Sequence, residues 1–111
     1  MTNETTESVS CEKTEILANK LREAINKGVP FFNEGRADRC YDVYSESAEA
    51  RSREPETCAE HKVKLREAVK EAAGKLELVN GEYISSSGYK NAAWILRKCF
   101  DEIIEDSLVQ E

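Results

Sequence analysis

The chain has 111 residues, 34% of them charged and 40% hydrophobic, with a formal net charge of −6. This length fits one domain that can bury its own core, and the acidic balance without a concentrated basic region disfavours nucleic-acid binding. No apolar run reaches the roughly 18–20 residues that a membrane span needs, so we expect a soluble protein.

The N-terminal segment is polar and acidic. Residues 1–9 hold one aliphatic side chain after Met1, Val9, which predicts a flexible tail followed by a single helical domain over residues 10–108. The segment has neither the basic start nor the apolar block of a signal peptide. If Met1 is the natural start, we expect the cytoplasm or another reducing compartment, in which the four cysteines are thiols.

The first two predicted helices span residues 10–28 and 36–53. Ser10 can cap the first helix, and Gly28-Val29-Pro30 predicts its end, because Pro disfavours a helical residue before it. Residues expected to face the core lie three or four apart; they are Leu17, Leu21, Ala24, Ile25 and Gly28, then Cys40, Val43, Tyr44, Ser47 and Ala48.

The third predicted helix covers residues 55–79, with Pro55 in its first turn. Its core positions alternate steps of four and three: Cys58, Lys62, Leu65, Val69, Ala72, Leu76 and Val79. Lys62 interrupts this apolar row, and Gly74 suggests a close helix crossing. Flanked by Glu60 and Lys62, His61 is expected to be partly exposed.

The fourth predicted helix, from Ser86 to Leu108, carries the widest apolar stripe. The stripe comprises Ala92, Ile95, Leu96, Cys99, Phe100, Ile103, Ile104 and Leu108. Such a stripe needs more than one partner helix to cover it. The sequence therefore predicts an all-α fold, either a four-helix antiparallel up-down-up-down bundle or two stacked helical hairpins. Tyr83 and Ile84 are expected to pack back onto the bundle.

Residues 24–47 carry a pattern of small and aromatic residues: Ala24, Gly28, Phe31, Gly35, Cys40, Tyr44 and Ser47. The pattern resembles one helical hairpin of the tetratricopeptide repeat family. It does not recur one repeat length, about 34 residues, further along, and Pro30 departs from it. The resemblance implies a scaffold that binds another protein.

The four cysteines form no CxxC motif and the chain has one histidine, so we expect no metal site and no cofactor. We interpret the four cysteines first as small residues of the core. If the chain is oxidised, similar heights in an antiparallel bundle would pair Cys11 with Cys58 and Cys40 with Cys99. Without a nucleophile motif or a glycine-rich phosphate loop, the sequence also gives no reason to expect an enzyme.

Aromatic residues are expected to gather at one end of the bundle, where the turn between the first two helices meets the start of the fourth. They are Phe31, Phe32, Tyr41, Tyr89 and Trp94. This aromatic end predicts a surface that binds a partner protein, although a hydrophobic plug would place the same residues there. The alternative function is carriage of a small apolar ligand or pigment in the bundle core. A solvent-accessible Trp94 beside Phe32 would favour the contact surface.

Overall fold

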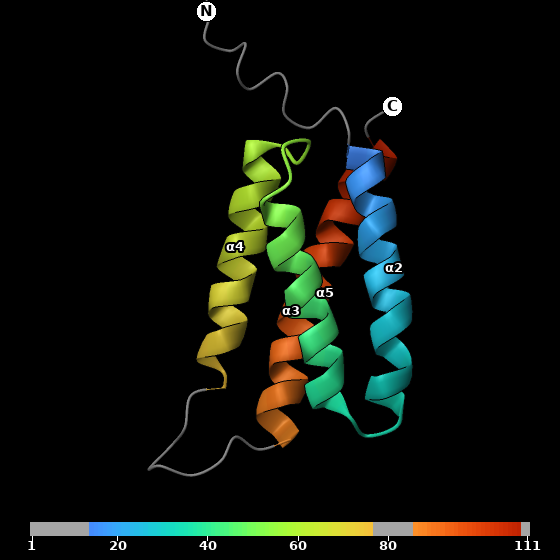
Figure 1. Ribbon diagram of the computed structural model, residues 1–111, viewed down its shortest axis with the longest axis vertical. Helices are drawn as coiled ribbons and strands as arrows, with labels where there is room; N and C mark the ends of the chain where they lie inside the picture. The colour runs from blue at the N-terminus through green and yellow to red at the C-terminus, as the bar shows by residue number, and fades with distance from the viewer. Residues whose placement is uncertain (1–13, 77–85, 110–111) are drawn as a thin grey trace, which may run out of the picture.

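The computed structural model describes residues 14–76 and 86–109, which form four helices running alternately up and down (Figure 1). Helices α2 (Thr14–Asn33) and α4 (Ala59–Gly74) run in one direction, and α3 (Ala37–Ser52) and α5 (Ser86–Val109) in the other. Every regular element in these residues is a helix. The predicted all-α, antiparallel four-helix fold is therefore confirmed, and within these residues no helix is long and apolar enough to cross a membrane.

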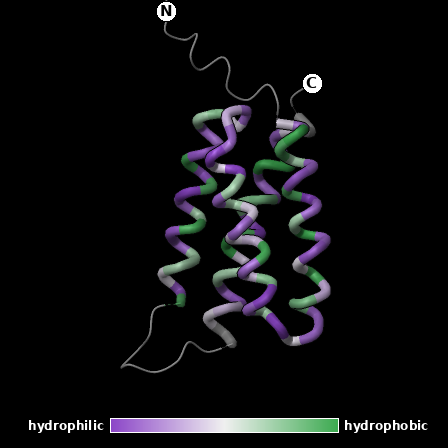
Figure 2. The backbone as a smooth tube through the Cα atoms, in the orientation of Figure 1, coloured by the Kyte–Doolittle hydropathy of each residue, from purple (hydrophilic) through white to green (hydrophobic). Residues whose placement is uncertain are grey.

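The core lies around α3 and α5, which pack on each other and between the flanking helices α2 and α4. Along each helix, hydrophobic and hydrophilic residues alternate with the helical period (Figure 2). The stripe predicted for α5 is the centre of the core, since Leu96, Phe100 and Ile103 have no exposed surface. Leu21 of α2 and Leu65 of α4 meet it from either side, also wholly buried.

Helix α2 continues through Pro30, so the predicted end at residue 28 is wrong. Its end is set by Gly35, whose φ of +83° is a conformation that glycine adopts without strain. The Gly35 amide donates to the Phe32 carbonyl (3.1 Å) and the Arg36 amide donates to the Phe31 carbonyl (2.8 Å), which is the Schellman pattern of helix termination. Pro30 removes one amide donor only a turn before this end, and the packing of both Phe side chains holds that turn.

Helix α4 is shorter than predicted, and two of its core positions differ from the predicted ones by one residue. It begins at Ala59 because the preceding residues form a turn, in which the Thr57 amide donates to the Glu54 carbonyl (3.1 Å). Its buried row consists of His61, Leu65, Ala68 and Ala72. His61 therefore occupies the core position assigned to Lys62, and the predicted exposure of His61 is wrong, since its side chain is 1% exposed.

The close helix contact occurs at Gly28 and not at Gly74. A Cβ atom at Gly28 would lie 2.5 Å from Cε1 of Tyr44 and 3.2 Å from Sγ of Cys40, whereas one at Gly74 would have no neighbour within 4 Å. Only a residue without a side chain lets α2 approach α3 this closely. The close approach of the two helices therefore occurs at Gly28, within the pattern that resembles a tetratricopeptide repeat hairpin. The sequence predicted a close crossing at Gly74 instead.

The bounds of α3 and α5 match the predicted helices closely. Several other predictions lie outside the described residues: the tail over residues 1–9, the helix start at Ser10, and the placement of Cys11, Val79, Tyr83, Ile84 and the Leu108 side chain.

Candidate functional site

The five aromatic residues predicted to share one end form separate contacts there. The α2–α3 turn and the first turns of α5 do lie at the same end of the bundle (Figure 1). The ring centroids of Phe32 and Trp94 are 6.1 Å apart with a nearly perpendicular, edge-to-face geometry. Those of Tyr41 and Tyr89 are 6.0 Å apart. The Phe31 ring lies 5.8 Å from the guanidinium of Arg39.

The aromatic end is therefore divided into two pairs and one cation–π contact. Tyr89 and Trp94 are five residues apart on α5, which turns their side chains about 140° from each other around the helix axis. Each consequently contacts a different neighbouring helix, Tyr89 reaching α3 and Trp94 reaching α2. The Phe32–Trp94 pair borders a hollow in the surface.

Trp94 is the most exposed large hydrophobic residue in the described part of the chain, with 56% of its surface accessible. Beside it is a hollow of about 210 Å³, which we call the Trp94 pocket. Three helices line it, and its lining residues are Val29, Phe32 and Asn33 of α2, Tyr44 of α3, and Ala93, Trp94 and Arg97 of α5. The sequence predicted Phe32 and Trp94 here but none of the polar members.

Tyr44 forms the inner wall of this pocket and is held there by tight packing. Its ring contacts Gly28 on one side and lies 5.5 Å, centroid to centroid, from Phe100 on another. Burial raises the pKa of the Tyr44 hydroxyl, and its hydrogen bond with the Cys40 thiol raises that pKa further. Burial likewise raises the pKa of the Cys40 thiol. Both groups therefore stay protonated at neutral pH and supply polarity without charge.

Among the described residues that line the Trp94 pocket, Arg97 is the only charged one. Its guanidinium lies 6.0 Å from the Trp94 ring centroid, and its Nε donates to Oδ1 of Asp101 at 3.3 Å. Partial burial opposes its charge, but the hydrogen bond and charge of Asp101 outweigh burial and raise the pKa of Arg97. Tyr44 acts in the same direction through its hydroxyl. The pocket thus combines the exposed ring of Trp94 and the partly buried ring of Phe32 with one permanent positive charge.

A signal for Arg97 was present in the sequence. Arg97 follows Trp94 by three residues, a spacing that puts both side chains on one side of a helix. Asn33 and Tyr44 carried no such signal, because their proximity to Trp94 depends on the extension of α2 past Pro30 and on the close α2–α3 approach at Gly28.

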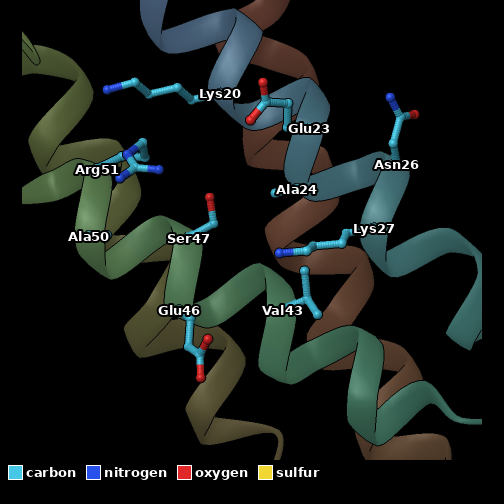
Figure 3. A pocket seen from close by; sticks show the side chains of 10 residues that line it. All are labelled: Lys20, Glu23, Ala24, Asn26, Lys27, Val43, Glu46, Ser47, Ala50 and Arg51. Carbon is cyan, nitrogen blue, oxygen red and sulfur yellow. The ribbon is translucent and has the colours of Figure 1, made fainter.

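A larger hollow, of about 570 Å³, lies between α2 and α3 (Figure 3). Lys20 and Lys27 extend from α2 toward α3 across it, and Arg51 lines it from α3. Lys20 and Arg51 both pair with one carboxylate, Glu54, at 3.2 and 2.9 Å. Charges of both signs line this groove and part of them already neutralise one another, as is typical of a solvated helix surface.

The cysteines differ in state. Cys40 and Cys99 are buried free thiols, so the bridge predicted between them under oxidising conditions is not present. They face different helices: Cys40 packs against Gly28 of α2, while the Cys99 thiol donates to the Lys64 carbonyl of α4 (3.6 Å). Cys58 is disulfide-bonded. Since Cys11 lies outside the described residues, its predicted pairing with Cys58 stays a prediction.

His61 lies at the opposite end of the bundle from Trp94. Its Nε2 is 3.3 Å from Oδ2 of Asp106 on α5, and because a carboxylate only accepts, Nε2 is the donor. Its buried Nδ1 has no hydrogen-bond partner in the described part of the chain. Within residues 14–76 and 86–109, no three His, Cys, Asp or Glu side chains are grouped so that they could hold a metal ion.

Comparison with known proteins gives no relative. No family model, curated protein or solved structure matches the chain.

Proposed function

We propose that this chain is a non-catalytic module that binds another protein through the surface around Phe32 and Trp94. The observation that supports this proposal most directly is the 56% exposure of Trp94 in contact with Phe32. An indole left in water gives up much of the stabilisation that its burial would provide. Tryptophan is also among the residue types that contribute most to binding energy when a partner covers them.

The surroundings of Trp94 support a contact surface over a hydrophobic plug. A plug would turn its aromatic faces inward, as Tyr44 and Phe100 do, whereas Trp94 stays more than half exposed. The other large exposed hydrophobic residues, Ile16 and Val63, are single aliphatic side chains, which are common on protein surfaces. Trp94 differs from them because an aromatic neighbour and a hollow adjoin it.

The packing of the interior favours this proposal over carriage of an apolar ligand or pigment. Wholly buried side chains fill the space between the helices; the largest are Phe100, Leu21, Leu65, Leu96 and Ile103. The Trp94 pocket, at about 210 Å³, is smaller than the roughly 300–1,000 Å³ of pockets that enclose drug-sized ligands. It has room for a side chain of a partner.

Site-specific photo-crosslinking tests the proposal. A photoreactive benzoylphenylalanine replaces Trp94 in one variant and Val63 in a matched control, because Val63 is 50% exposed but lies on α4. In cells of the source organism, we expect a discrete cross-linked protein product from position 94 and none from position 63. Excess unlabelled wild-type chain should suppress the product, and excess Phe32→Ala chain should suppress it much less.

The proposal fails if position 94 yields no discrete product, or if both positions yield the same products. It also fails if the Phe32→Ala chain competes as well as the wild type, because the partner would then not use the Phe32–Trp94 pair.

A further inference from the structure

Three basic residues of α5 lie around Trp94, although the chain as a whole has a net charge of −6. Lys90 lies four residues before Trp94, while Arg97 and Lys98 lie three and four residues after it. These spacings place all three cations beside Trp94 on the helix surface. Residues 86–100 contain no Asp or Glu, and Lys90 and Lys98 are exposed.

Stabilisation of α5 does not explain this charge distribution. A helix favours acidic side chains near its N-terminus and basic ones near its C-terminus, because of its macrodipole. In α5 the first turn has no acidic residue and the last turn has no basic one, while Glu105 and Asp106 lie near its C-terminal end. Lys90, Arg97 and Lys98 lie beyond the first turn of α5, where the macrodipole has little effect, so the macrodipole gives no reason for the cations around Trp94.

Arg97 has hydrogen-bonding capacity left for a ligand. Its single hydrogen bond to a carboxylate in the described residues runs from Nε to Asp101, whose side chain is 54% exposed. The Tyr44 hydroxyl accepts a second hydrogen bond from the guanidinium, and the donors that remain of its five N–H groups make no hydrogen bond to a carboxylate in the described residues. A guanidinium fork suits a carboxylate, which can accept two parallel hydrogen bonds from it. The amide side chain of Asn33 lines the same pocket.

From this arrangement we propose that the Trp94 pocket binds an acidic segment of the partner protein. A carboxylate of that segment lies on the Arg97 guanidinium, and an adjacent apolar side chain packs against Phe32 and Trp94. The inference rests on the proposed function and adds the chemistry of the partner to it. The volume of about 210 Å³ limits the pocket to one side chain at a time, and the surrounding cations disfavour a basic segment.

The intrinsic fluorescence of Trp94 provides the test, because it is the only tryptophan in the chain. The probes are acetylated, amidated tetrapeptides of the form Gly-Φ-Glu-Gly, in which Φ is Val, Leu, Ile, Met or Phe, and their Gly-Φ-Gln-Gly counterparts. For at least one Φ, we expect the Glu peptide to bind about tenfold more tightly than its Gln counterpart, as a charge-assisted hydrogen bond predicts. Arg97→Gln should remove this difference, whereas the matched surface variant Lys98→Gln should leave most of it.

Three results would overturn this inference. They are no saturable change in Trp94 fluorescence with any Glu peptide, equal affinity for Glu and Gln peptides, and a Glu preference that persists in Arg97→Gln. N-acetylglutamate alone is the control for a free carboxylate, and if it binds as tightly as the best peptide, the occupant is a small anion. A specific cross-link at position 94 together with equal Glu and Gln affinities would retain the proposed function and reject the acidic segment.

Discussion

The two ends of the bundle differ in which side chains they bury. At the end where α2 and α4 begin, which we call the polar end, four polar residues are at least 95% buried: Thr14, Ser52, Thr57 and His61. At the aromatic end, Trp94 is 56% exposed and Phe32 is only partly buried. A polar group is buried at a cost unless it is hydrogen-bonded, and an indole is exposed at a cost unless a partner covers it.

The polar end is stabilised by hydrogen bonds and ion pairs, whereas the aromatic end leaves the Trp94 side chain exposed to solvent. At the polar end the Ser52 hydroxyl donates to the Glu49 carbonyl (2.8 Å), His61 reaches Asp106 on α5, and Glu54 accepts from Lys20 of α2. The His61 contact joins α4 to α5, and the Lys20 contact joins α2 to the turn that follows α3. At the aromatic end, the described residues make no comparable polar interaction between helices over Trp94, so truncations there should affect binding more than stability.

Replacement of His61 by Ala should have the largest effect on folding. The side chain is 1% exposed and occupies a core position of α4, so the variant loses packing and its hydrogen bond to Asp106. We expect the free energy of unfolding, measured by urea denaturation, to fall by about 3 kcal/mol. Lys62→Ala, next to it but only partly buried, should change stability by less than about 1 kcal/mol. Equal effects would contradict the register of α4.

Alkaline pH should weaken the interior between the two ends. Burial raises the pKa of the Cys99 thiol from 9.0 to about 11, with the neighbouring Glu102 charge adding to the shift. The folded state therefore disfavours the thiolate, and stability that is complete below pH 9 is lost as the pH rises through about 11. The loss due to Cys99 should be about 2–3 kcal/mol.

A comparison with Cys99→Ala isolates this contribution from those of Tyr44 and Cys40, whose pKa values burial raises in the same direction. The stability difference between wild type and the variant should shrink between pH 9 and 11. A difference that is constant with pH would show that Cys99 ionises as easily in the folded chain as in the unfolded one.

Gly28→Ala should destabilise the chain by about 1–2 kcal/mol, because the added methyl group would meet the Tyr44 ring that forms the inner wall of the Trp94 pocket. Gly74→Ala is the matched control in open space and should be neutral or stabilising by up to about 1 kcal/mol. Thermal or urea denaturation of both variants measures the contrast. If Gly28→Ala were as stable as Gly74→Ala, the α2–α3 contact would be looser than the structure has it.

Trp94→Ala should have the smallest effect on stability and the largest on binding. More than half of the indole is exposed, so we expect a loss of less than about 1 kcal/mol, similar to that of Val63→Ala. In contrast, binding of Glu peptides, measured by calorimetry, should be lost in Trp94→Ala and kept in Val63→Ala. A loss of several kcal/mol of stability in Trp94→Ala would mean that Trp94 closes the bundle.

Much of the fold followed from residue spacing. Apolar residues recur at helical spacing along α3 and α5, and neither segment contains an internal Pro. This periodicity alone was therefore enough to predict both helices. The predicted end of α2 was wrong because Pro30 suggests that the helix ends before it. The helix ends at Asn33, where the two backbone hydrogen bonds of the Gly35 and Arg36 amides terminate it. Two core positions of α4, Leu65 and Ala72, were predicted correctly, but Lys62 was assigned the core position that His61 occupies, because the charged neighbours of His61 suggested a surface residue.

The candidate site was predicted only in part. Phe32 and Trp94 were expected to meet because antiparallel connectivity brings the α2–α3 turn to the start of α5. The five aromatic residues share the predicted end of the bundle, but their positions around each helix separate them into two pairs and one cation–π contact. Arg97, Asn33 and Tyr44 were missed, since the pocket forms only where three helices converge, and spacing within one helix does not report that convergence.

The central claim is that the Trp94 side chain is exposed to solvent beside Phe32, where a partner protein can bind it. The fluorescence of Trp94 in the isolated monomeric chain tests this claim most directly. The account predicts a red-shifted emission that acrylamide quenches readily, and protection from acrylamide once an acidic peptide is added. A blue-shifted emission that acrylamide barely quenches in the peptide-free monomer would show a covered indole and contradict the account.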